Sequence, residues 1–325
     1  MDHAGSAGAG AGRHLLNAEA PGRLDACIAA AVPGLSRARV QRLIEGGHVL
    51  LNGEVARKSA RVEAGDRIEL TLPETGHDAA EPGFDLPVLY EDDALAVIDK
   101  PAGLAVHGAP GDTAPSVAGW WLARLGPAAT AFDAEHPGIV HRLDKETSGV
   151  LLLAKTPAAQ AALSRAFELR RVHKCYLAMV EGQPRPPHAV VEAPIHRDPR
   201  DRTRMAVTAR GRPSRTEYRV VAGDGGRSLL EVFPETGRTH QIRVHLASIG
   251  HPVVGDPVYG RAGEGRRHLL HAWRLELPHP TGGTLRASAP PPADLLEAIR
   301  AIAGEAVASR YAAPPAVTCE RGQPS

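Results

Sequence analysis

Residues 141–149 read His141-Arg142-Leu143-Asp144-Lys145-Glu146-Thr147-Ser148-Gly149, and the apolar run Val150-Leu151-Leu152-Leu153-Ala154 follows directly. Such a run is typical of a buried strand. Asp144 lies between the cations Arg142 and Lys145, and nearby positive charge favours the ionised form of a carboxyl group. An ionised carboxylate at the end of a strand is a candidate nucleophile or base. A surface turn with a solvated cluster of ion pairs explains the same residues and stays open at this point.

The composition limits the class of protein. A length of 325 residues indicates about two domains, and 43% hydrophobic with 23% charged residues are typical of a soluble globular protein. The three cysteines show no paired spacing, which favours a reducing compartment without disulfides or a zinc knuckle. No stretch approaches the roughly 20 apolar residues that span a bilayer, and residues 1–14 lack the apolar core of a secretory signal. We therefore expect a cytoplasmic protein with no membrane partner.

The charge is unevenly distributed, although the net charge is only +1. Eight arginines stand between positions 197 and 219, against three acidic residues. This segment is compatible with a surface that faces phosphates. A solvated basic loop explains it equally well.

Composition and periodicity predict two domains between mobile ends. Residues 1–20 are predicted to be a disordered tail, and residues 306–325 a mobile tail. Residues 74–87 are polar and broken by Gly and Pro, which is typical of a linker. The linker separates a small domain, residues 21–73, from a larger one, residues 88–305.

The small domain is predicted to contain two short helices followed by a hairpin sheet with an Asn-Gly turn. Arg37, Arg39 and Arg42 lie on the outer face of its second helix. A basic helix face suits a nucleic-acid backbone. A small protein-binding module has the same pattern.

The larger domain is predicted to be of the α+β class. Short apolar runs such as Tyr176 to Val180 and Leu229 to Phe233 alternate with turns, and helical stretches intervene at 157–171 and 240–249. Many strands with inserted helices indicate a mixed, largely antiparallel sheet.

As a whole, the nonapeptide resembles the catalytic motif of the RluA/RluD-type pseudouridine synthases, which isomerise uridine in RNA to pseudouridine. Other segments resemble motifs of this family in the same order: Asp99-Lys100-Pro101-Ala102-Gly103, Lys174-Cys175-Tyr176, Arg238-Thr239-His240-Gln241-Ile242-Arg243, Gly255-Asp256-Pro257-Val258-Tyr259-Gly260 and Leu270-His271-Ala272. The small domain resembles the RNA-binding domain of the ribosomal-protein S-four type. The resemblance extends from Arg23 to Ile302 and favours the RluD-like branch, whose members act on large-subunit ribosomal RNA.

The resemblance implies roles for particular residues. It assigns the nucleophile to Asp144, the arginine that pairs with it to Arg243, and the ring that stacks on the extruded base to Tyr176. The expected RNA-binding and base-flipping residues are Arg142, His141 and Leu270, with Arg37, Arg39 and Arg42 of the small domain. Without the resemblance, Tyr176 could equally be an ordinary core residue of a strand, and Arg243 could pair with His240, three positions earlier on the predicted helix.

Neither a cofactor nor a metal is expected. Isomerising a uridine breaks and remakes bonds to one base without a redox step. His240 and His245 point about 140° away from each other on an α-helix, whereas two metal ligands on one helix prefer a spacing of four residues.

We therefore predict a monomeric RNA pseudouridine synthase of ribosome biogenesis that uses an aspartate nucleophile and base flipping. The first alternative is a non-catalytic RNA-binding or ribosome-assembly factor on the same scaffold. The intact set of Asp144, Tyr176 and Arg243 speaks against it, because decay would spare the scaffold before the pocket. A metal hydrolase is the second alternative and predicts inhibition by chelators.

Overall fold

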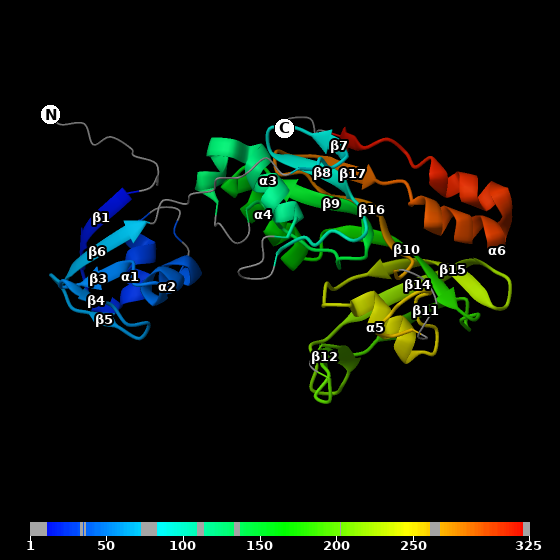
Figure 1. Cartoon of the computed structure of the whole chain (residues 1–325), viewed down its shortest axis with the longest axis horizontal. Coiled ribbons are helices and arrows are strands. Elements are labelled where there is room, and N and C mark those ends of the chain that lie inside the picture. Colours follow the sequence, from blue (N-terminus) through cyan, green and yellow to red (C-terminus); the bar gives the residue numbers. More distant parts are fainter. Residues whose placement is uncertain are drawn as a thin grey trace. The chain divides into compact units, whose positions relative to one another are not determined.

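In the computed structural model, the sequence forms the helices and strands shown in Figure 1. The structure describes residues 12–32, 35, 37–72, 83–108, 114–132, 137–201, 203–260 and 267–320. The chain divides into two units, the first within Met1–Gly83 and Trp121–Pro137, the second within Phe84–Trp120 and Gly138–Ser325. The division after Gly83 falls inside the predicted linker.

The first unit contains the two helices and the hairpin sheet expected from the sequence. Its elements are β1 (Gly12–Asn17), β2 (Gly22–Arg23), α1 (Leu24–Ala31), α2 (Arg37–Glu45), β3 (Val49–Leu51), β4 (Glu54–Val55), β5 (Arg61–Val62) and β6 (Arg67–Leu72). Four strands form a sheet in the order β1-β6-β3-β4. Leu24, Ile28, Val40, Val49 and Ile68 are fully buried and form the centre of its core. The hairpin turns at Asn52 and Gly53, both with positive φ, as an Asn-Gly turn requires.

The prediction that residues 1–20 form a disordered tail is wrong from Gly12 onward. Strand β1 pairs with β6 in antiparallel register, from Gly12 opposite Leu72 to Asn17 opposite Arg67. Ala18, just after the strand, is buried in the core of the unit. The local composition gave no sign of this strand, because its paired residues lie fifty to sixty positions further along the chain. The rest of that predicted tail, residues 1–11, lies outside the described part.

The second unit is built on one large sheet, and the predicted α+β class is confirmed. Its strands are β7 (Val88–Glu91), β8 (Leu95–Lys100), β9 (Ser148–Ala154), β10 (His173–Glu181), β11 (His188–Glu192), β12 (Ile195–Arg197), β13 (Met205–Val207), β14 (Arg215–Gly223), β15 (Arg227–Pro234), β16 (Leu270–Pro278), β17 (Thr284–Ser288) and β18 (Thr318–Glu320). Its helices are α4 (Pro157–Glu168), α5 (Gln241–Ser248) and α6 (Ala293–Ala312). Helix α3 (Val117–Leu125) begins in the second unit, while its residues from Trp121 on and the 3-10 helix η1 (Gly126–Ala131) are assigned to the first unit. The ten-stranded sheet runs β11-β14-β15-β10-β16-β9-β8-β7, with β17 and β18 branching from β16.

The sheet is mixed and largely antiparallel, as predicted. Among the described strands, β9 and β16 form a parallel pair, with Ser148 opposite His271 and Gly149 opposite Ala272. Every residue of β9 is buried, which explains the uninterrupted apolar run that follows the nonapeptide. The turn with Asp144 thus leads into a buried strand that lies between β16 and β8.

The prediction of a mobile tail at residues 306–325 is wrong as far as Glu320, and residues 321–325 lie outside the described part. Helix α6 continues to Ala312, although Gly304 interrupts its helical dihedral angles with φ of 80°. The Tyr311 ring packs on Trp273 at 4.7 Å between centroids, and its hydroxyl donates to Glu231. Strand β18 then pairs with β17. These contacts are tertiary, so the small polar residues of this segment gave no local sign of them.

The end of the predicted linker belongs to the second unit. Leu86 is buried, and the Asp85 carboxylate accepts a hydrogen bond of 3.0 Å from the indole of Trp120. In the described part of the chain, no helix is both long enough and apolar enough to cross a membrane.

Candidate active site

Asp144 lies in a turn that leads into β9. The Thr147 amide donates to the Asp144 carbonyl at 3.0 Å and closes this turn. Behind it, the fully buried Lys100 ammonium donates to the carbonyl of Lys145 at 3.1 Å and to two carbonyls of its own segment. Burial lowers the pKa of Lys100 to about 8. A buried cation that binds three carbonyls fixes the backbone next to Asp144.

The residues after the turn are anchored to β16. Thr147 Oγ1 lies 2.8 Å from Nε2 of His268, and Ser148 Oγ lies 2.9 Å from Nδ1 of His271. Burial lowers the pKa of both histidines to about 4, so both rings are neutral at neutral pH. Gly149 has φ of 111°, and a Cβ at this position would lie 2.2 Å from the carbonyl oxygen of Ala272. Only glycine allows β9 and β16 to approach this closely.

Arg243, in the first turn of α5, binds two carboxylates at once. Its Nη1 donates to Oδ2 of Asp144 at 3.0 Å, while Nε and Nη2 donate to the two oxygens of Asp256 at 2.7 and 2.8 Å. Burial opposes the charged guanidinium, but the bonds and charges of Asp256 and Asp144 outweigh it and raise the pKa of Arg243. Arg243 therefore does not form the alternative pair with His240 along the helix, but joins carboxylates from two other segments.

Asp256 is buried and fully bonded. Besides Arg243, its Oδ1 accepts the backbone N–H groups of Val258 at 2.9 Å and Tyr259 at 3.1 Å. Burial disfavours its charge, but the bonds from Arg243 hold the pKa of Asp256 below its ordinary value. A buried ion pair is stabilising only when its geometry and hydrogen bonds are complete, and here they are.

His240 faces Asp144 from the start of α5. Its backbone is left-handed, with φ of 56° and ψ of 19°, and its Nε2 lies 4.0 Å from Oδ2 of Asp144. Its Nδ1 lies 2.9 Å from the Tyr259 hydroxyl. The Tyr259 ring lies 5.2 Å from the guanidinium carbon of Arg243. His240 and Tyr259 thus belong to the surroundings of Asp144.

A pocket of about 410 Å³ opens at this point of the second unit. Residues that line it include Arg142, Asp144, Tyr176, His240, Arg243 and Leu270. The Asp144 side chain is 20% exposed, so its carboxylate is accessible from the pocket. Burial, with the negative charge of Asp144, raises the pKa of Tyr176, and its hydroxyl stays protonated. Tyr176 is half-buried and borders the pocket, in contrast to the alternative of an ordinary core residue.

The pocket rim carries further polar residues. Arg142 is exposed. His141 accepts the Leu152 amide through Nε2 at 2.9 Å and stacks on Phe167, and burial lowers its pKa to about 3. His141 thus braces the turn against β9. Burial also lowers the pKa of Lys174 in the pocket to about 8.

The structure brings six of the predicted site residues into this pocket and leaves three in the first unit. Arg37 is exposed and pairs with Asp25 at 3.2 Å. Burial opposes the charge of Asp25, but its hydrogen bonds, with that from Arg23 the strongest, hold its pKa well below the ordinary value. Arg39 and Arg42 lie on α2, and their side chains are outside the described part.

The sequence did not assign roles to Asp256, Tyr259, His240 and Lys174. Asp256 and Tyr259 stand in a segment that resembles a family motif, which is a signal of importance but not of function.

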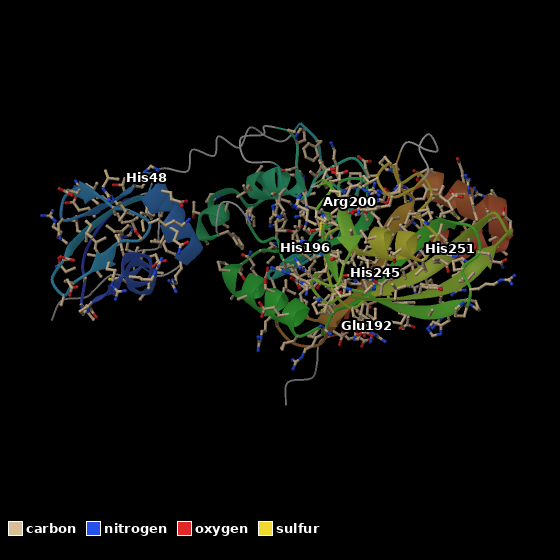
Figure 2. The ribbon with its side chains drawn as sticks, turned by 90° about the horizontal axis from the view of Figure 1, so that it is seen from below. His48, Glu192, His196, Arg200, His245 and His251 are labelled. Carbon is tan, nitrogen blue, oxygen red and sulfur yellow. The ribbon has the colours of Figure 1, made fainter. Side chains whose placement is uncertain are left out.

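His245, shown in Figure 2, uses both ring nitrogens for Thr216 Oγ1 and the Ala193 carbonyl, each at 2.9 Å. Within the described residues, no group of three or more His, Cys, Asp or Glu side chains is arranged to hold a metal ion.

Comparisons with known proteins agree with this geometry. A family model described as RNA pseudouridylate synthase matches residues 94–248, and one described as S4 domain matches residues 22–68. An uncharacterized RNA pseudouridine synthase of Chloroflexus aurantiacus is 48% identical over 286 residues, which cover 86% of this chain and 89% of that protein. The ribosomal large subunit pseudouridine synthase D of Nitrosomonas europaea is 43% identical over 293 residues, which cover 86% of this chain and 84% of that protein.

Solved structures show the same likeness. The human RNA pseudouridylate synthase domain containing 1 is similar to this chain with a TM-score of 0.53 and 29% identity, covering 65% of this chain and 86% of that structure. The human RNA pseudouridylate synthase domain containing 4 is similar to this chain with a TM-score of 0.52 and 28% identity, covering 66% of this chain and 92% of that structure. The family expected from the sequence is confirmed: the chain belongs to the RNA pseudouridine synthases, isomerases that convert uridine in RNA to pseudouridine, and carries an S4 domain ahead of its catalytic domain.

Proposed function

We propose that Asp144 is the nucleophile of this isomerisation and acts on a uridine that is flipped out of the RNA into the pocket. The observation that carries the proposal is the bond from the buried Arg243 to Oδ2 of Asp144, on a carboxylate that stays 20% exposed to the pocket. The guanidinium fixes the position of the carboxylate, and the exposure leaves it accessible to a nucleotide.

The chemistry balances without an external reagent. Asp144 attacks C1′ of the ribose as the bond between C1′ and N1 of uracil breaks. The base turns, and C5 then attacks C1′ and displaces the carboxylate, so that Asp144 is regenerated. A proton leaves C5, and N1 takes one up. The pocket supplies a nucleophile in Asp144, and the neutral ring of Tyr176 borders the pocket where it can stack on the base. Leu270 supplies an apolar wall for the base.

Base flipping requires a side chain that fills the gap left in the RNA. Arg142 is exposed at the pocket rim, two positions before Asp144, and suits this role. His141 contributes by holding the turn that presents Arg142, since its ring is bonded to Leu152 and stacked on Phe167.

The rest of the RNA is contacted by basic surfaces of both units. In the second unit, His196 and Arg197 of β12 and Arg200 after it are exposed. His196 and Arg200 are labelled in Figure 2. In the first unit, Arg37, Arg39 and Arg42 of α2 lie within the segment matched by the S4 domain. We infer that the substrate is large-subunit ribosomal RNA. The name of the Nitrosomonas europaea relative, ribosomal large subunit pseudouridine synthase D, supports this inference. A cytoplasmic monomer suits this substrate.

The test is Asp144→Asn, which removes the charge and almost no volume. RNA incubated with the variant and digested to nucleosides should contain no pseudouridine, while the melting temperature and the RNA affinity stay close to those of the wild type. Asp224→Asn, in the turn between β14 and β15, is the matched control and should keep full activity. Even a few per cent of the wild-type rate in Asp144→Asn would rule out the nucleophile role.

The same assay tests two further points: whether the protein is a non-catalytic RNA-binding factor, and which class of RNA it modifies. A non-catalytic RNA-binding factor would bind RNA and form no pseudouridine in wild-type form. Separate incubations with large-subunit, small-subunit and transfer RNA, each unmodified, should show modification of the large-subunit RNA. Modification confined to transfer RNA would overturn the inferred substrate and leave the role of Asp144 intact.

A further inference from the structure

The Tyr259 hydroxyl connects three segments around the pocket. It accepts the backbone N–H of Met205, at the start of β13, at 2.8 Å. It also lies 2.9 Å from Nδ1 of His240. The rings of His240 and Tyr259 meet edge to face, with 5.7 Å between centroids and 79° between planes. The orientation of the His240 ring is therefore set by this tyrosine.

Counting protons decides which nitrogen of His240 carries hydrogen. A backbone amide only donates, so the bond from Met205 occupies a lone pair of the Tyr259 oxygen. The hydroxyl proton needs an acceptor, and among the described residues Nδ1 of His240 is the one within reach. If Nδ1 carried the hydrogen instead, the hydroxyl proton would have no protein acceptor in this part of the chain, which costs free energy. The neutral ring therefore carries its proton on Nε2.

The Nε2 atom faces the nucleophile. It lies 4.0 Å from Oδ2 of Asp144, the oxygen that also accepts Nη1 of Arg243. No described residue donates to the other oxygen, Oδ1. The left-handed backbone of His240, with φ of 56°, turns its ring to this position at the very start of α5. Left-handed histidine is uncommon and is found where a site requires it.

We propose that His240 is a positioning residue for the nucleophile, which donates its Nε2–H to Oδ2 of Asp144 when RNA is bound, and that Tyr259 fixes the tautomer of His240 that makes this bond possible. Arg243 and His240 then both hold Oδ2, and Asp144 attacks through Oδ1. The gap of 4.0 Å closes in the complex, as catalytic hydrogen bonds commonly tighten once substrate is bound. This inference rests on the proposed role of Asp144.

The electrostatic surroundings agree with a neutral donor. Burial lowers the pKa of His240, the charges of Asp144 and Asp256 act in the opposite direction, and those of Arg243 and Arg142 add to the effect of burial. A neutral ring donates one N–H without placing a second full positive charge beside Arg243.

The first test observes the tautomer directly. In nitrogen NMR spectra of the full-length protein with labelled histidine, the resonances lost in His240→Asn identify this ring. We expect Nε2 protonated and Nδ1 unprotonated at pH 8, and a shift toward the other tautomer in Tyr259→Phe. A wild-type ring protonated on Nδ1 would overturn the proposal, and this result needs no variant to be active.

The second test uses a double-mutant cycle on the single-turnover rate. Tyr259→Phe removes one hydroxyl and should slow the reaction by about tenfold. His240→Asn, which tolerates the left-handed backbone, should slow it by about tenfold or more. Adding Tyr259→Phe to His240→Asn should cause almost no further loss, because the tyrosine acts through the histidine. Independent, multiplying losses would show that Tyr259 acts on something else.

Tyr218→Phe is the control, because it removes a buried hydroxyl that donates to the Pro186 carbonyl, away from the pocket-lining residues. It should keep the wild-type rate, and a Tyr259→Phe variant as active as this control would also overturn the proposal. If Asp144→Asn is inactive and the cycle shows no coupling, only this inference fails. If Asp144→Asn is active, the proposed role of Asp144 is wrong, and the inference that rests on it is wrong as well.

Discussion

Arg243 and Asp144 stand 99 positions apart in the sequence and meet through one hydrogen bond of 3.0 Å between Nη1 and Oδ2. The remaining edge of the same guanidinium is occupied by both oxygens of Asp256. One rigid, planar fork therefore fixes the direction from which Asp144 is held. A lysine ammonium is a point charge on a flexible chain and cannot bind both carboxylates in this plane.

Arg243→Lys tests whether the fork matters beyond its charge. We expect the single-turnover rate of pseudouridine formation to fall by about 100-fold, while the Kd for RNA hardly changes, because Arg243 is buried and does not form the outer RNA surface. Rate and binding are measured on the same RNA. A variant with a rate close to that of the wild type would show that charge alone is sufficient.

Asp256→Asn should reduce both stability and rate. The buried Arg243 loses the partner of its Nε and Nη2 atoms, and breaking a buried pair of this kind costs about 3 kcal/mol in the free energy of unfolding. The rate should fall because Nη1 is no longer aimed at Asp144. Denaturant unfolding and single-turnover assays measure the two effects. Asp294→Asn is the control: it breaks the bidentate pair with Arg267 at a half-exposed carboxylate and should cost less stability and no activity.

The sequence predicted the parts of the site that are encoded locally. The apolar run after the nonapeptide predicts β9, and the spacing of residues 240–249 predicts α5. The resemblance to a family then joined Asp144 with Arg243, which no local pattern could do. Asp256 was missed because its role depends on a turn that folds back onto α5, thirteen positions after Arg243.

Pairing between distant segments also limited the prediction of the fold. Strand β1 has six residues and is recognisable only through β6, which lies beyond both helices of the first unit. Tyr311 likewise stands in a segment with the composition of a tail, and its contacts with Trp273 and Glu231 come from distant parts of the chain. Contacts of this kind are set by tertiary packing, which a window of neighbouring residues does not contain.

The buried His271 should make the protein less stable in mild acid. Burial lowers its pKa from 6.5 to about 4, while the ring takes up a proton freely in the unfolded chain. Stability is therefore full above pH 6.5 and falls as the pH drops toward 4, with a slope of about 1.4 kcal/mol per pH unit from this ring. His271→Gln should have a smaller slope between pH 6.5 and 4 in denaturant titrations. Tyr218→Phe, which removes a buried bond without a group that titrates in this range, should keep the slope of the wild type. Equal slopes in His271→Gln and the wild type would contradict the prediction.

Arg39 and Arg42 should determine part of the salt dependence of RNA binding. They lie on α2 within the segment matched by the S4 domain, whereas Arg37 on the same helix is already paired with Asp25. Each lost phosphate contact lowers the slope of log K against log salt by about 0.7 to 0.9, so the double variant Arg39→Gln, Arg42→Gln should lower it by about 1.4 to 1.8. Binding is measured over a salt series with catalytically inactive Asp144→Asn as the background. Arg300→Gln, on α6 and paired with Glu305, is the control and should leave the slope unchanged. If the double variant has the slope of this control, α2 contacts no phosphate, and RNA binding by the first unit must use another of its faces.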